Sequence, residues 1–267
     1  MRLAITHTST YSFDQPMRYG LQQLRLTPKT SVGQIVLDWS MTIDGGQIET
    51  DFLDHHKNTV SLISFAADAQ DITVRCSGTI ETEDQNGVVG KQAGLVPLWL
   101  FRRPTDLTVP TVRLRSLTTG LRKEHENDIA LLHALSARIL EAVPYRIGAT
   151  DAATTADAAL VQGSGVCQDH AHIFLATARH LGFPARYVSG YLKMDGNDRQ
   201  DATHAWAEAH IDGIGWVGFD VSNSISPDER YVRVATGLDY REAAPIAGLR
   251  FGTGNEVLAV DVVVQQQ

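Results

Sequence analysis

A chain of 267 residues with a net charge of −8 and a pI near 5.6 is long enough for one large domain or two ordinary ones. This acidity makes nucleic acid and anionic membrane surfaces poor partners, and no apolar run reaches the length of a membrane span. The first residues lack the apolar core of a signal peptide, so a cytoplasmic location is expected. Two cysteines, Cys76 and Cys167, lie too far apart in the sequence to suggest a disulfide framework.

The first hundred residues are predicted to form a series of short strands. Apolar residues alternate with polar ones in segments that begin at Leu3 and continue through 22–27, 34–43, 59–65 and 72–82, with turns expected at 14–16, 27–28, 44–46 and 54–58. This spacing is typical of a β-sandwich or a curled antiparallel sheet. Cys76 shares the apolar face of its strand and is expected in the core. The adjacent His55 and His56 favour a plain surface turn over a metal site.

A proline-containing segment, from Gly94 to Pro110, is the best candidate for a linker between domains. Its Leu98-Trp-Leu-Phe101 stretch is too apolar for a free tether and is expected to pack at the domain interface. The linker predicts a β-rich domain over residues 1–105 and a second domain over residues 106–267. A closing strand at 256–264 is counted with the second domain, although its pattern does not assign it to a sheet.

Three helices are predicted after the linker. Asn127 is expected to cap an amphipathic helix that runs from Asp128 to about Val143, and a short helix follows at about 156–162. The third helix begins at Cys167, directly after Gly163-Ser-Gly165, and ends before Gly182 and Pro184. Its apolar residues recur at helical spacing, at Ala171, Phe174, Leu175, Ala178 and Leu181.

The position of Cys167 in the first turn of a helix favours the thiolate form of its side chain. Unpaired backbone N–H groups and the positive end of the helix dipole lower the pKa of a thiol placed there, and the thiolate is the nucleophilic form. A lone cysteine at a helix start would be read more simply as a small buried residue. The residues that follow in the chain favour a nucleophilic cysteine over a small buried one.

A strand at 202–211, a turn at Asp212-Gly-Ile-Gly215 and a second strand that ends at Asp220 predict a β-hairpin. With a loop of three residues, position 206 lies opposite position 220, and His204 and Asp220 become diagonal neighbours on one face. A loop of two residues would put them on opposite faces. With the odd loop, Asp220 can orient the His204 ring, and His204 can take the proton of Cys167.

Four motifs follow one another in this part of the chain: Gly165-Val-Cys-Gln-Asp169, Leu181-Gly-Phe-Pro-Ala-Arg-Tyr-Val-Ser-Gly-Tyr191, Thr203-His-Ala-Trp206 and Gly215-Trp-Val-Gly-Phe-Asp220. Together they resemble the core of the bacterial transglutaminase-like proteins, which are often described as cysteine proteases. The resemblance covers about residues 140–225 closely and the N-terminal hundred residues more loosely. It implies Cys167, His204 and Asp220 as a catalytic triad. Two departures from the family pattern, His170 in place of an aromatic residue and Val221 in place of proline, leave the triad intact.

The fold expected from these features is α+β. An all-β N-terminal domain precedes a papain/transglutaminase-like core, in which the nucleophile helix packs on an antiparallel sheet. The expected reaction is acyl transfer from a peptide or protein amide through a thioester, with hydrolysis favoured over amine transfer and with no cofactor. The backbone N–H of Cys167 is the natural first oxyanion donor. The second donor stays open between Tyr145 and Gln162.

Two other functions compete with the enzyme. One is an interaction module that keeps the fold without catalysis, although none of the three triad residues is lost. The other is a metal site built from residues of one region, namely Cys167, His170, His172, His204 and His210. The spacing of these residues disfavours a metal site. His204 and His210 lie about 20 Å apart along a strand, and His172 points away from the Cys167 face of its helix.

Overall fold

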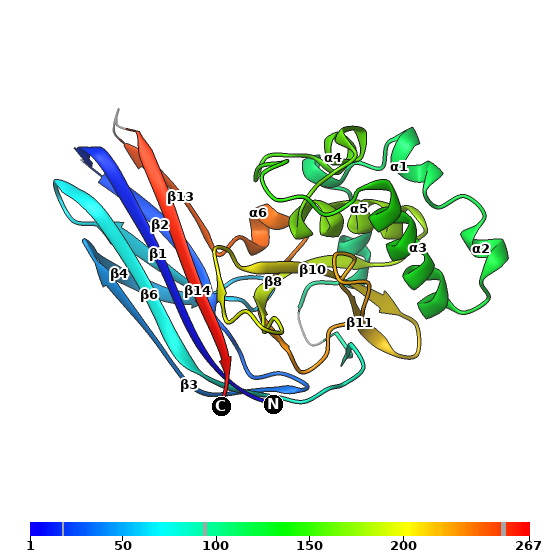
Figure 1. Cartoon of the computed structure of the whole chain (residues 1–267), viewed down its shortest axis with the longest axis horizontal. Helices are drawn as coiled ribbons and strands as arrows, with labels where there is room; N and C mark the ends of the chain where they lie inside the picture. The colour runs from blue at the N-terminus through cyan, green and yellow to red at the C-terminus, as the bar shows by residue number, and fades with distance from the viewer. Residues whose placement is uncertain (18, 93–94, 252–254) are drawn as a thin grey trace.

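The computed structural model describes residues 1–17, 19–92, 95–251 and 255–267. Two antiparallel sheets form a sandwich at one end of the molecule, and a third sheet covered by helices forms the other end (Figure 1). The α+β class and the β-rich N-terminal region expected from the sequence are confirmed. Among the helices of the described residues, none has both the length and the apolar character needed to cross a bilayer.

The sandwich is formed by a five-stranded and a four-stranded sheet. The first has the order β3-β6-β1-β14-β9, with β1 Arg2–Met17, β3 Gln34–Asp44, β6 Ala69–Thr82, β9 Arg199–Gln200 and β14 Glu256–Gln266. The second has the order β13-β2-β5-β4, with β2 Tyr19–Thr27, β4 Gly46–Leu53, β5 Thr59–Phe65 and β13 Ile246–Phe251. Alternate residues of β1, from Leu3 to Phe13, are buried, as the period of a strand requires.

The core of the sandwich lies between these two sheets. Its buried side chains include Phe13, Leu24, Ile63, Val74 and Cys76. Cys76 is 1% exposed, which confirms the core position expected for it. Two details differ from expectation: β4 was not anticipated, and β1 continues through the turn expected at 14–16. The pairing of β1 with β6 is irregular between Ser12 and Met17, so the proline bends the pairing without ending the strand.

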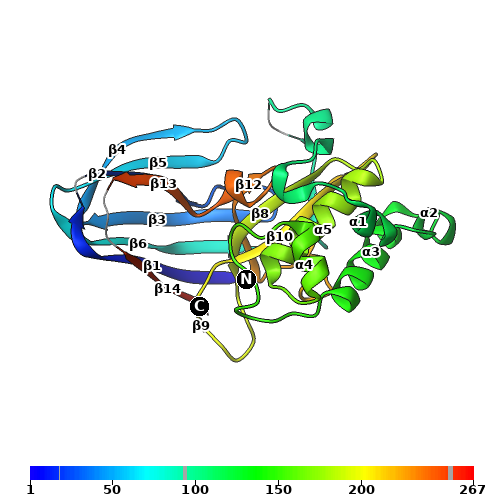
Figure 2. The same ribbon diagram turned by 90° about the horizontal axis from the view of Figure 1, so that it is seen from above.

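The third sheet carries the helices. Its order is β12-β8-β10-β11-β7, with β7 Val88–Gly90, β8 Ala185–Leu192, β10 His204–Ile211, β11 Gly215–Phe219 and β12 Tyr231–Gly237. The α-helices are α1 Val112–Ser116, α2 Leu121–Glu124, α3 Asp128–Ala142, α4 Ala156–Gln162, α5 Cys167–His180 and α6 Tyr240–Ala243. Seen from above, α1 to α5 lie at the end of the molecule away from the sandwich (Figure 2). The helices expected from Asp128 and from Cys167, and the short helix at 156–162, are all present.

Helix α5 packs on β10 through small side chains. Ala205, Ala207 and Ala209 alternate along the strand, are buried, and belong to the same apolar core as Phe174 and Ala178 of the helix. Alanine lets the helix backbone approach the sheet closely, because nothing larger fills the space between them. This packing fixes where the first residue of α5 lies relative to the strand that begins at His204.

The chain does not divide at residue 105 as the linker suggested. Both C-terminal strands pair with N-terminal ones: β13 with β2, and β14 with β1 along eleven residue pairs from Leu3 to Phe13. In Figure 1 the red β14 accordingly lies beside the blue β1. The closing strand therefore belongs to the sandwich and not to the second domain. In the other direction, β7 precedes the linker but pairs with β11 of the helix-bearing sheet.

The segment after β7 runs along the junction of the two halves. Gly94, where the linker was expected to begin, lies outside the described residues, and the remainder contains two 3-10 turns, Leu98–Arg102 and Asp106–Thr108. Phe101 is buried, with its ring 5.0 Å from that of Trp216 on β11 and 5.7 Å from that of His56. The expected apolar contact at the interface is thus made by Phe101, whereas Trp99 is 60% exposed.

A valine pair tests the placement of the C-terminal strand. Val264 of β14 is fully buried in a core that joins the sandwich to β8 and β12, whereas Val257 of the same strand is 67% exposed. Val264→Ala should lower the free energy of unfolding by about 2 kcal/mol because it leaves a cavity in that core. Val257→Ala is the matched control and should change it by less than about 0.5 kcal/mol. Equal urea midpoints for the two variants would contradict the pairing.

Candidate active site

Cys167 is the first residue of α5 and is a free, half-buried thiol. The turn before it is held by Asp169, whose Oδ2 accepts hydrogen bonds from the backbone N–H of Val166 at 2.8 Å and from the Thr150 hydroxyl at 2.5 Å. A side chain at Gly165 would force Asp169 to shift, because its Cβ would lie 2.8 Å from the same carboxylate oxygen. Glycine and aspartate together therefore present the cysteine at the helix start.

His204 and Asp220 meet as the hairpin geometry predicts. Strands β10 and β11 pair in the register Ile211 with Gly215 and Ala207 with Phe219, which leaves a loop of three residues, 212–214. The Nε2 atom of His204 lies 2.6 Å from Oδ2 of Asp220. The structure thus confirms the expected odd loop and the contact between the two side chains.

The Asp220 carboxylate is buried and is held by several donors. Besides the His204 ring, Oδ2 accepts hydrogen bonds from the Tyr231 hydroxyl at 2.7 Å and from the side-chain amide of Asn223 at 2.7 Å. Burial by itself would raise the pKa of Asp220, but the hydrogen bonds from His204, Asn223 and Tyr231 outweigh it, and the pKa is lowered. Asp220 therefore carries its negative charge at neutral pH.

The charge on Asp220 and the neighbouring thiol keep the His204 ring protonated. Burial would lower the pKa of His204, but the charge of Cys167 and the hydrogen bond to Asp220 together raise it to about 10. With Nε2 directed at Asp220, Nδ1 is the ring nitrogen left for the sulfur. A protonated imidazole therefore lies beside the cysteine at the start of α5.

Aromatic rings surround the histidine. The His204 ring stacks against Trp206 with centroids 6.1 Å apart, and the Tyr231 ring lies 5.9 Å from His204 and 5.4 Å from Trp206. Tyr231 thus contacts both the imidazole and the carboxylate. The sequence analysis did not predict that Tyr231 and Asn223 contact Asp220. The one feature that pointed to Tyr231 was its position at the start of the strand expected from residue 231.

The two oxyanion candidates differ in the structure. The side-chain amide of Gln162 donates to the carbonyl oxygen of Ala149 at 2.5 Å and is therefore already engaged. Tyr145 is half exposed, and its backbone pairs with Gly165 two residues before the cysteine. Burial, followed by the charges of Cys167 and Asp220, raises the pKa of Tyr145, so its hydroxyl remains a proton donor. Tyr145 stays the better candidate of the two.

The other histidines near Cys167 have separate partners. The two ring nitrogens of His170 contact the Ser222 hydroxyl at 2.8 Å and the Val143 carbonyl at 2.6 Å, which ties α5 to the loop after Asp220 and to the end of α3. His172 is fully buried, and its Nε2 accepts the backbone N–H of Tyr240 at 3.2 Å. These contacts position the helix and leave the thiol to His204.

The prediction that His55 and His56 lie in a plain surface turn is wrong for His56. Its side chain is 1% exposed, and its Nε2 lies 2.8 Å from Oε2 of Glu242 on α6. His55 is exposed, and the three residues offer ligand atoms within 4.8 Å of one another. The sequence could not reveal the cluster, because Glu242 follows 186 residues later.

Comparison with known proteins places the chain in a family. Residues 115–221 match the model of the transglutaminase-like superfamily, and residues 3–81 match that of the bacterial transglutaminase-like N-terminal region. An uncharacterized protein of Mycobacterium leprae is 30% identical over 99% of this chain and 98% of its own. The chain belongs to the transglutaminase-like superfamily. The resemblance seen in the sequence motifs is thereby confirmed.

Two further proteins are similar to this transglutaminase-like chain, one in structure and one in sequence. A candidate cysteine protease from Cytophaga hutchinsonii superposes with a TM-score of 0.79 at 24% identity, covering 100% of this chain and 91% of that one, and so shares the fold. A protein-glutamine gamma-glutamyltransferase of Pseudomonas aeruginosa is 31% identical over 157 residues, which are 52% of this chain and 23% of that protein.

The two cysteines provide an internal comparison of reactivity. Burial raises the pKa of Cys76 to about 12, whereas Cys167 lies at a helix start beside His204. Iodoacetamide at pH 7 should therefore label Cys167 at least about tenfold faster than Cys76, as measured by mass spectrometry of tryptic peptides. Preferential labelling of Cys76 in the native protein would exclude a reactive Cys167.

The protonation of His204 can be followed directly by NMR. Because its pKa is raised to about 10, the His204 ring signals should not titrate between pH 5 and 8 and should shift only as the pH approaches 10. Asp220→Asn and Cys167→Ala should each move that titration to lower pH, since each removes a group that raises the pKa. A wild-type midpoint near 6.5 would show that neither group acts on the ring.

Proposed function

We propose that this protein is a thiol-dependent acyl-transfer enzyme that acts on an amide or peptide bond, with Cys167 as nucleophile, His204 as acid and base, and Asp220 as the orienting carboxylate. The observation that carries the proposal is the His204 ring, held by a buried carboxylate at Nε2 and adjacent to a helix-start thiol. Membership of the transglutaminase-like superfamily supports a thiol enzyme.

In the proposed reaction the Cys167 thiolate attacks the amide carbonyl carbon, and the carbonyl electrons move to oxygen. The backbone N–H of Cys167, which lies in the first turn and has no helical partner, donates to that oxyanion. His204 gives its proton to the leaving amine as the C–N bond breaks, which leaves a thioester. Neutral His204 then takes a proton from water as the water oxygen attacks the thioester, and the thiolate is released as the carboxylic acid forms.

Hydrolysis is the proposed outcome, because water needs no site of its own. Transfer to a second amine is the alternative, and one observation favours it: the Pseudomonas protein that is 31% identical over 157 residues bears the name protein-glutamine gamma-glutamyltransferase. The proposed partner is accordingly a peptide or protein that presents an amide, a glutamine side chain being the first to examine.

With glutamine-containing peptides, ammonia release without incorporation of a fluorescent amine indicates hydrolysis, and incorporation indicates transfer; with a general peptide library, mass spectrometry of the products detects peptide-bond cleavage. Cys167→Ala should abolish turnover, since no thioester can form. Asp220→Asn should lower kcat by about 10³ or more, because the ring loses its charged partner. Cys76→Ala is the matched control and should retain activity, as should wild type in EDTA. Undiminished turnover by Cys167→Ala would refute the proposal.

A further inference from the structure

A cavity of about 300 Å³ lies between the sandwich and the helix-bearing sheet. The loop after β2, the turn after β4, the segment after β7 and strands β8 and β12 supply its walls. Of the described residues that line it, five are cationic and none is a carboxylate; the cationic ones are Lys29, Lys57, Lys91, Arg186 and Arg233. Such a lining is unusual in a chain whose net charge is −8.

The cavity lies on the face of the sheet that α5 does not cover. Ala185 and Tyr187 of β8 pack with α5, so the intervening Arg186 points to the opposite face. The same alternation places Glu208 of β10 beside it. The Cys167 site and this cavity therefore use different parts of one sheet.

Two guanidinium groups share one buried carboxylate at this place. Glu208 is fully buried, with its oxygens 2.6 Å from Nε of Arg186 and 2.8 Å from Nε of Arg233. The Arg186 guanidinium also lies 4.0 Å above the ring of Trp216, which fixes its plane. Each guanidinium has five N–H donors, so these contacts leave donors available to a ligand.

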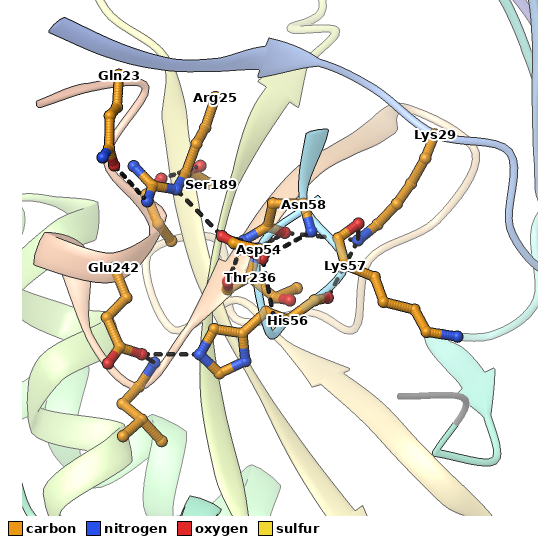
Figure 3. A network of polar contacts seen from close by, with 12 residues as sticks. Gln23, Arg25, Lys29, Asp54, His56, Lys57, Asn58, Ser189, Thr236 and Glu242 are labelled. Carbon is orange, nitrogen blue, oxygen red and sulfur yellow. Dashed lines mark hydrogen bonds and ion pairs between the residues drawn. The ribbon is translucent and has the colours of Figure 1, made fainter. Parts of the chain in front are cut away.

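Lys29 adds a third positive charge without adding a negative partner. Its Nζ donates to the carbonyl oxygen of Lys57 at 2.8 Å and approaches the side-chain oxygen of Asn58 at 3.4 Å, both of which are neutral acceptors (Figure 3). Burial, together with the charges of Arg233 and Arg186, lowers the pKa of Lys29 to about 8. The ammonium thus lies in a region of excess positive charge.

The other carboxylates close to the cavity are already engaged. Asp54 pairs with Arg25 at 3.4 Å and accepts hydrogen bonds from Asn58, and Glu242 pairs with His56 at 2.8 Å (Figure 3). Three cations therefore face one carboxylate, Glu208. Buried charges are costly unless an opposite charge offsets them. The same excess disfavours a metal cation at His55, His56 and Glu242.

We propose that this cavity binds a small organic oxyanion, a phosphate ester or a polycarboxylate, between Arg186, Arg233 and Lys29. Guanidinium groups bind the paired oxygens of phosphate and carboxylate with two parallel hydrogen bonds each. A volume of about 300 Å³ suits a small metabolite and not a polymer. Because its walls come from both halves of the molecule, a bound anion would hold the sandwich against the helix-bearing sheet.

Isothermal titration with inorganic phosphate and with citrate, at constant ionic strength in chloride, tests the site. We expect saturable binding of one anion per chain. Arg233→Met should weaken it by at least about tenfold through loss of a charged, bidentate donor. Lys91→Glu, at an exposed rim position, should weaken it severalfold, whereas the matched control Arg115→Glu, exposed on α1 outside the cavity, should leave it unchanged.

The comparison of probes identifies the ligand class: tighter phosphate indicates a phosphate ester, and tighter citrate a polycarboxylate. Circular dichroism checks that Arg233→Met is folded. If Arg233→Met does not fold, the affinity of Lys91→Glu for the anion tests the site instead. Binding should be the same in Cys167→Ala, so the outcome does not depend on the proposed catalysis. The absence of saturable binding by both probes, or wild-type affinity in both Arg233→Met and Lys91→Glu, would overturn the proposal.

Discussion

The buried contact between His204 and Asp220 is the constraint on which the rest of the site depends. A carboxylate that is 1% exposed must be matched by donors, and His204, Tyr231 and Asn223 supply them from β10, β12 and the loop between β11 and β12. Three neighbouring segments of the chain are thereby fixed around one oxygen. The imidazole gains its orientation from the same contact, and Cys167 and Asp220 together raise its pKa.

The packing of α5 brings the thiol to that imidazole. The row of alanines on β10 sets the distance between helix and strand, and the strand begins at the histidine. The sandwich packs against β8 and β12 of the same sheet, where its Leu3, Ile5 and Val264 form one core with Tyr191 and Val232. The β-rich half thus supports the sheet that carries His204, so its packing is coupled to the geometry of the site.

Local patterns in the sequence predicted the parts of the structure that local forces determine. The helix start at Cys167 and the three-residue loop of the hairpin follow from spacing within about twenty residues, and both are present. The contact of His56 with Glu242 joins residues 186 positions apart, and the pairing of β14 with β1 joins segments that are farther apart still, at the two ends of the sequence. Periodicity shows that a strand exists but not which strand it will join, so the domain boundary at residue 105 was misplaced.

The pairing of β1 with β14 also bears on how the chain folds. The segment from α1 to β12 is continuous in sequence and contains the whole of α5 and four of the five strands of the helix-bearing sheet. By contrast, β1 can satisfy one of its edges only after residues 256–266 have emerged from the ribosome. Such a long-range closure is slow because the loop it closes is large. During synthesis one edge of β1 therefore stays unpaired until β14 is made, and an unpaired strand edge can associate with other chains at that stage.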